Sequence, residues 1–184
     1  MVVTVPSGET MEQLVPTLVR VRRENADLAA VMLRPGVPAE QLPDDLPADL
    51  RRLLALTDGP CFGVRASLHP ADEIGYFQDL DALADAAGIP NAGDYLNIGS
   101  VNEAPLLYDR RDGSIWVARA DSGLWYQGCT LERTADSLDG FVSEWVAGPR
   151  FPELVRLPAG DGDEDVLAWD DWWRLLQAAG RVPA

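Results

Sequence analysis

The sequence predicts a single α+β domain over residues 1–184, with an antiparallel sheet of about four to six strands and flanking N- and C-terminal helices. The 184 residues are 47% hydrophobic and 24% charged, which is enough to bury a core without disulfides or a metal. Strand-like segments follow one another in the middle of the chain, with helical patterns before and after them. Grouped strands favour an antiparallel sheet over a parallel sheet with interleaved helices.

Two helical patterns come before the strands. Residues 11–33 carry an apolar stripe, and because proline is tolerated in the first turn of a helix, this helix is expected to begin near Pro16. Residues 46–59 form the second pattern. Pro47 suits its first helical position, and Gly59 is expected to end it.

The central segments have strand and hairpin signals. The strand candidates are residues 61–66, 95–101, 105–109, 114–118 and 124–132. Asp112-Gly113, between the third and fourth candidates, is typical of a hairpin turn. A short helix over residues 80–88 is expected between the first two candidates, with Asp79 as its N-cap and Gly88 at its end.

Two further helices are predicted after the strands. Residues 137–148 can be capped by Asp136 or Ser137, and Trp145 is expected to be largely buried. Residues 165–180 form a tryptophan-rich helix, in which Trp169, Trp172 and Trp173 are spaced to share one face. We expect this face to pack on the core of the domain. The alternative is that it anchors a partner, because tryptophan is enriched in interface hot spots.

The charge balance restricts the classes of partner. Thirty acidic and fifteen basic residues give a formal net charge of −15, which repels nucleic acid and anionic membrane surfaces and attracts a basic protein. The charge can also serve solubility alone. All basic residues are arginine, so a P-loop lysine, a Schiff-base lysine and a kinase ATP-site lysine are excluded. The absence of a long apolar stretch and of a signal peptide, together with the presence of only two cysteines, predicts a cytoplasmic protein with no membrane span.

Residues that could carry chemistry are few. His69 is the only histidine, so a catalytic site would have to use it, with Asp72 or Glu73 beside it. We expect His69 to be a surface residue instead. Cys61, His69 and Cys129 match no zinc-site spacing, so no metal and no cofactor is expected, and both cysteines should be buried and reduced.

Loop acids and exposed aromatic residues are the candidates for contact with a protein partner. Acids in loops beside a sheet are free to point outward, because the core does not need them. The candidate contact residues are Asp72, Glu73, Asn102, Glu103, Asp109, Trp169, Trp172 and Trp173. The chain is expected to be a monomer or a weak homodimer.

The ordered segments resemble the SUKH superfamily, the Smi/Knr-type domain. LPADLRRLLALTDGPCFG, residues 46–63, is similar to the family's entry motif of a proline-led helix and a short aromatic-glycine segment. SLHPADEIGYF is similar to the link that follows, with Ile74 as its apolar anchor. The residues from Asn97 to Ala118 resemble the family's hairpin, and SLDGFVSEWVAG resembles its closing helix. The resemblance covers about residues 40–150 and leaves out the first and last helices.

The resemblance implies a binding module without an active site. It implies a bacterial immunity protein that neutralises a toxin acting in the cytoplasm, and the acidic charge would suit a basic toxin domain. The alternatives are an adaptor or regulatory protein without a toxin partner, or an enzyme that uses His69.

Overall fold

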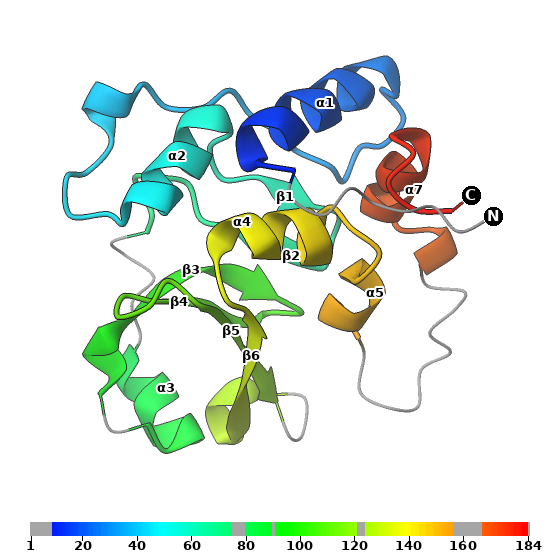
Figure 1. Cartoon of the computed structure of the whole chain (residues 1–184). Helices are drawn as coiled ribbons and strands as arrows, with labels where there is room; N and C mark the ends of the chain where they lie inside the picture. Colours follow the sequence, from blue (N-terminus) through cyan, green and yellow to red (C-terminus); the bar gives the residue numbers. More distant parts are fainter. Residues whose placement is uncertain (1–8, 75–79, 90, 121–123, 157–166, 184) are drawn as a thin grey trace.

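An antiparallel sheet of six strands forms the centre of the molecule, in the sequential order β1-β2-β3-β4-β5-β6 (Figure 1). The computed structural model describes residues 9–74, 80–89, 91–120, 124–156 and 167–183. The strands are β1 (Cys61–Phe62), β2 (Ala66–Leu68), β3 (Tyr95–Val101), β4 (Ala104–Asp109), β5 (Ile115–Ala120) and β6 (Cys129–Ala135). The predicted α+β class with an antiparallel sheet is confirmed.

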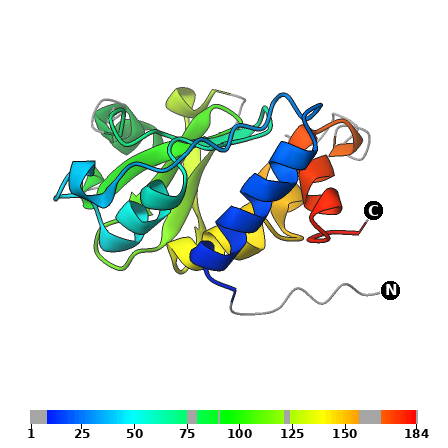
Figure 2. The same cartoon turned by 90° about the horizontal axis from the view of Figure 1, so that it is seen from above.

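Helices cover both faces of the sheet. On one face lie α1 (Met11–Glu24), α2 (Ala48–Leu56), α4 (Leu138–Gly140), α5 (Phe151–Leu154) and α7 (Asp171–Ala178), and α4 continues into a π-helix (Phe141–Val146). Figure 2 shows α1 beside α7. Helix α3 (Leu80–Ala87) covers the other face, where a smaller apolar cluster gathers around Leu83 and Leu107. Strand β4 is buried along its whole length because it lies between the two clusters.

Helix α1 begins at Met11, so the expected start near Pro16 is wrong, and so is the predicted helical extent to residue 33, because the helix ends at Glu24. The start is fixed by the Gln13 side chain, whose oxygen accepts the backbone N–H of Thr10 at 3.2 Å. Met11 itself is fully buried. Burial of the first turn and its cap therefore offset the cost of an internal proline, about 3 kcal/mol.

The central hairpins follow the sequence prediction closely. Strand β3 has the predicted bounds, and β4 and β5 pair around the turn at residues 110–113. Gly113 has a φ of +78°, and the Asp112 carboxylate accepts the backbone N–H of Ser114 at 3.0 Å. Asn102 and Glu103 form the tight turn between β3 and β4, with φ angles of 49° and 65°. These positive values are typical of a two-residue type I′ turn.

Two predicted strands are divided in the structure. The segment 61–66 holds β1 and the start of β2, which turn back on each other around Gly63, where φ is +74°. The segment 124–132 begins with a 3₁₀ turn (Trp125–Gln127) before β6 starts at Cys129.

The helices after the sheet are confirmed in part. Ser137 caps α4 by accepting the backbone N–H of Gly140 at 3.1 Å, and Trp145 is buried as predicted. The last helix begins only at Asp171, because the carboxylate of Asp170 caps it. Trp169 therefore precedes the helix, and the predicted face shared by three tryptophans is wrong. The predicted N-cap Asp79 and the predicted start at residue 165 lie outside the described residues.

Candidate functional site

A cleft of about 490 Å³ opens between the loop before α2, the loop after β2, the start of α3 and the first residues of β3. Its apolar lining comprises Leu46, Ala71, Ile74, Leu80, Tyr95 and Leu96. Asp45 and Arg110 are charged residues that also line it. We call these residues, together with the loop acids Asp72 and Glu73, the acidic cleft.

The loop over residues 70–74 is held by specific hydrogen bonds. The carboxylate of Asp58 accepts the backbone N–H of Ala71 at 2.8 Å, and the Pro70 carbonyl accepts the N–H groups of Glu73 and Ile74 at 3.0 and 3.2 Å. Ala71 and Ile74 are thereby buried, and Asp72 and Glu73, which lie between them, are exposed. The expected outward orientation of these two acids is confirmed.

One acid, Asp45, lines this cleft, and two more acids, Asp72 and Glu73, follow the lining residue Ala71 in the sequence. Asp45, Asp72 and Glu73 are all exposed, and none of them forms an ion pair within the part of the chain that the structure describes. Arg110 is the cation among the cleft-lining residues. An apolar floor with carboxylates beside it suits a side chain that has an aliphatic stem and a cationic head.

Asp109, by contrast, does not point outward, which corrects the sequence prediction. Its carboxylate is 2% exposed. It accepts hydrogen bonds from Arg111 Nη2 at 2.6 Å and from Arg111 Nε at 2.9 Å. This pairing with the Arg111 guanidinium holds the pKa of Asp109 below its ordinary value. Asp109 organises the β4–β5 turn and is not available to a partner.

Asn102 and Glu103 lie at the opposite end of β3 from the acidic cleft. The Asn102 side chain donates to the carbonyl of Val155 at 3.2 Å, so it fastens the segment after α5 to the sheet. Glu103 is exposed. The candidate loop acids therefore do not form one surface: Asp72 and Glu73 belong to the acidic cleft, and Glu103 does not.

The three tryptophans of the last predicted helix have three different environments. Trp172 is completely buried, and its Nε1–H donates to the Val146 carbonyl at 2.7 Å. Trp173 is half-buried and stacks on Phe151 with the ring centroids 6.5 Å apart. Trp169 is 85% exposed. Trp172 therefore packs on the core of the domain, as we expected of this segment, and only Trp169 is open to a partner.

His69 is half-buried at the end of β2. Burial lowers the pKa of its imidazole, while a hydrogen bond with the Asn97 side chain and the charge of Glu73 act in the opposite direction. Its backbone N–H donates to the carbonyl of Ile98 at 2.9 Å. The expected surface position is thus correct only in part, because strand β3 binds both the backbone and the side chain of His69.

The two cysteines lie at opposite edges of the sheet and are not joined in a disulfide. Cys129 is buried, as predicted, whereas Cys61 is half-exposed, which corrects the expectation that both are buried. A zinc ion could not be reached by both side chains across six strands. Among the described residues, no group of three or more histidine, cysteine, aspartate or glutamate side chains could hold a metal ion.

Sequence reasoning found two acids of the cleft and missed its apolar floor. Leu46, Tyr95 and Arg110 come from separate segments, and no local pattern indicates that they meet. Comparisons of the chain with models of protein families, with curated proteins and with solved structures give no match. In the described part of the chain, none of the helices has the length and apolar character needed to cross a bilayer.

Proposed function

We propose that this chain is a non-enzymatic protein-binding module that holds a basic protein partner at the acidic cleft. We further propose that the partner is a toxin acting in the cytoplasm and that the chain is the immunity protein that occludes it. The resemblance of residues 40–150 to the SUKH superfamily supports this reading of the partner.

The observation that carries the proposal is the acidic cleft itself. Asp45, Asp72 and Glu73 are exposed without ion-pair partners among the described residues, beside an apolar floor in a chain of net charge −15. Such a surface accelerates the encounter with a positively charged protein and rejects partners of like charge. The apolar floor offers the desolvated contact that surface charges alone do not supply.

The first experiment is to identify the partner and to test neutralisation. Complexes are captured on the tagged full-length chain in the native cell, and each captured protein is then expressed alone in a susceptible host. We expect a basic protein that arrests growth and is relieved by co-expression of this chain. A captured partner that is acidic, or that is harmless when expressed alone, would contradict the proposal.

The second experiment assigns binding to the acidic cleft. The double variant Asp72→Lys/Glu73→Lys should weaken the complex and abolish protection. The matched control is Glu24→Lys/Asp27→Lys. It reverses Glu24, the last residue of α1, and Asp27, in the turn that follows, and changes the net charge by the same amount. Helix α1 lies on the other side of the sheet from α3 (Figure 1). Unlike Asp72 and Glu73, these two acids form ion pairs, with Arg20 and Arg174. Equal losses in both double variants would show that total charge, and not the cleft, controls binding.

A further inference from the structure

Strand β6 is an edge of the sheet that is open to addition of another strand. It pairs with β5 on one side only. Within the described ranges, the backbone groups of Leu131 and Arg133 form no hydrogen bond with a segment on the other side. Figure 1 shows β6 as the outermost strand, leading up into α4. An edge strand of seven residues presents a row of backbone donors and acceptors to an incoming chain.

The register indicates which backbone groups of β6 point outward. The Ser114 carbonyl accepts a backbone N–H from the end of β4 at 2.9 Å, so Ser114 faces β4. Because successive residues alternate, Val117 faces β6, where Glu132 is its partner. The backbone groups of Leu131 and Arg133 therefore point away from β5, towards the open edge.

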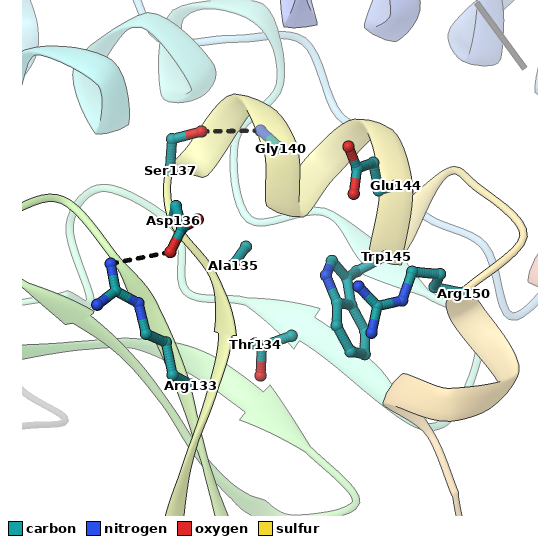
Figure 3. A pocket seen from close by; sticks show the side chains of 9 residues that line it. All are labelled: Arg133, Thr134, Ala135, Asp136, Ser137, Gly140, Glu144, Trp145 and Arg150. Atoms are coloured by element: carbon teal, nitrogen blue, oxygen red, sulfur yellow. Dashed lines mark hydrogen bonds and ion pairs between the residues drawn. The ribbon is translucent and has the colours of Figure 1, made fainter. Parts of the chain in front are cut away.

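A cavity of about 350 Å³ adjoins this edge (Figure 3). Five consecutive residues, Arg133 to Ser137, line one wall. Three of these residues, Arg133 to Ala135, are the last of β6, where the register with β5 shifts opposite Ile115 and Trp116. The wall therefore lies at the C-terminal end of the edge strand. Gly140, Glu144 and Trp145 supply the opposite wall from the helix that follows β6.

The charges of this cavity favour a basic side chain. Arg150 already stacks on the Trp145 ring, 3.5 Å from the centroid, and pairs with a glutamate of α5 at 3.1 Å. Arg133 pairs with Asp136 at 2.9 Å. Both guanidinium groups are thus engaged. Glu144 is exposed, and its carboxylate has no ion-pair partner in the part of the chain that the structure describes.

A second copy of this chain fits the edge poorly. Each copy carries a net charge of −15, so association of two copies is opposed over the whole surface. Antiparallel pairing about a two-fold axis centred on Glu132 or Arg133 would also place like charges directly opposite each other. The charge of the chain and of the cavity instead matches an extended basic segment of a different protein.

We propose that β6 and its adjoining cavity form a strand-addition site for an extended basic segment of a partner protein. The main chain of that segment would pair with Leu131 and Arg133, and one of its arginine or lysine side chains would enter the cavity beside Glu144. Main-chain pairing supplies affinity in such complexes, and pockets for alternate side chains supply specificity. The inference rests on the proposed function only in taking the partner to be a basic protein, because the surface is distinct from the acidic cleft.

The test is an NMR titration of the isotope-labelled full-length chain. The probe is a pool of capped synthetic peptides in which arginine alternates with valine, threonine or isoleucine. We expect the amide signals of β6 and the indole signal of Trp145 to shift progressively. A matched pool with the same charges, but with N-methyl groups on alternate backbone amides, cannot form a ladder and should bind about tenfold more weakly or not at all.

Variants separate the backbone from the side chains. Arg133→Pro removes an outward N–H without removing a donor of the β5 ladder, and should lower affinity about tenfold. Arg133→Ala keeps this N–H and should bind like the wild type, within about twofold. Another peptide pool carries citrulline, which is neutral, in place of arginine. The wild type should bind the arginine pool more tightly than the citrulline pool, and Glu144→Gln should reduce this difference in affinity. The N-methylated pool tests the ladder even if Arg133→Pro fails to fold.

Three results would overturn the inference: no shift of β6 signals at millimolar peptide, shifts that spread over the whole acidic surface, or equal binding of the methylated pool. Failure here is distinguishable from failure of the proposed function. If Asp72→Lys/Glu73→Lys weakens the native complex and Arg133→Pro does not, the acidic cleft is the binding site and β6 is not. If only Arg133→Pro weakens the complex, β6 is the binding site and the acidic cleft is not.

Discussion

Replacement of Trp172 by alanine tests how the last helix is held on the domain. The side chain is 0% exposed, and the centroid of its ring lies 4.9 Å from the centroid of the Phe62 ring. A buried tryptophan removes about 150–250 Å² from water, which at ~25 cal/mol per Å² gives an upper bound of about 4–6 kcal/mol. Truncations of large buried aromatic residues cost about 3–5 kcal/mol. We expect Trp172→Ala to lower the free energy of unfolding by that amount.

Three related variants divide this cost by its physical cause. Trp172→Phe keeps most of the ring but removes the Nε1–H, which leaves the buried Val146 carbonyl without its donor, and should cost about 1–3 kcal/mol. Trp169→Ala should change the free energy of unfolding by less than about 0.5 kcal/mol, because the side chain is 85% exposed. Trp173 is half-buried and stacks on Phe151, so the loss of free energy of unfolding in Trp173→Ala should lie between the losses in Trp169→Ala and Trp172→Ala.

The assay is urea unfolding followed by far-ultraviolet circular dichroism. The slope of the unfolding free energy against urea concentration should be the same in all variants. If Trp172→Ala cost less than about 1 kcal/mol, or no more than Trp169→Ala, the reasoning would be refuted. The last helix would then be an appendage and not part of the core.

Three further predictions concern titration and metal. The pKa of Asp109 is lowered by Arg111, so its stabilising contribution is present at neutral pH and is lost as pH falls through that lowered pKa. The stability difference between the wild type and Asp109→Asn should therefore narrow from about pH 7 to about pH 3 in urea titrations, and a constant difference would contradict this. Burial raises the pKa of Asp170, so its charge opposes folding increasingly as pH rises through that pKa. Asp170→Asn keeps a capping oxygen and should be at least as stable as the wild type at neutral pH. Asp170→Ala removes the cap and should lower the free energy of unfolding by about 1 kcal/mol. If Asp170→Ala were the more stable of the two variants, Asp170 would not act as the N-cap of the last helix. Elemental analysis should find no stoichiometric metal, and Cys61, which is half-exposed, should react with thiol reagents before Cys129; about one metal ion per chain would overturn this view.

The central hairpin could be predicted from the sequence because its signals are local. Asp112-Gly113 supplies a residue that tolerates positive φ between two apolar runs, and Gly113 indeed has a φ of +78°. The sequence places Asn102 and Glu103 in a loop between two strands, but the tight two-residue turn there was not predicted because it contains no glycine. A glutamate in the left-handed region is uncommon, so the pairing on both sides of the turn, rather than its own sequence, holds Glu103 there.

Errors at the other elements came from local side-chain contacts that apolar periodicity does not reveal. The spacing of Trp169, Trp172 and Trp173 fits a helix, but Asp170 accepts the backbone N–H groups of Trp172 and Trp173 at 2.9 and 3.1 Å and starts the helix there. Asp109 resembles any hairpin acid in sequence, but the turn folds the guanidinium of Arg111, two residues later, back onto its carboxylate. Helix α1 tolerates Pro16 because its first turn is capped and buried.

The candidate sites could be predicted only as far as exposure. Asp72 and Glu73 were recognisable as loop acids, and they are exposed beside the acidic cleft. The floor of that cleft joins segments from before α2 to after β4, which periodicity cannot relate. The open edge of β6 depends on strand order, and strand order is a property of the whole sheet.

The most direct test of the central claim is the association rate of the chain with its captured partner as a function of salt. For the wild type, the rate should fall steeply from about 10 mM to about 150 mM salt, while the dissociation rate changes less. For Asp72→Lys/Glu73→Lys the rate should be lower at low salt and nearly flat, whereas Glu24→Lys/Asp27→Lys should retain most of the wild-type slope. An association rate that ignores salt, or one that falls equally in both double variants, would contradict binding of a basic partner at the acidic cleft.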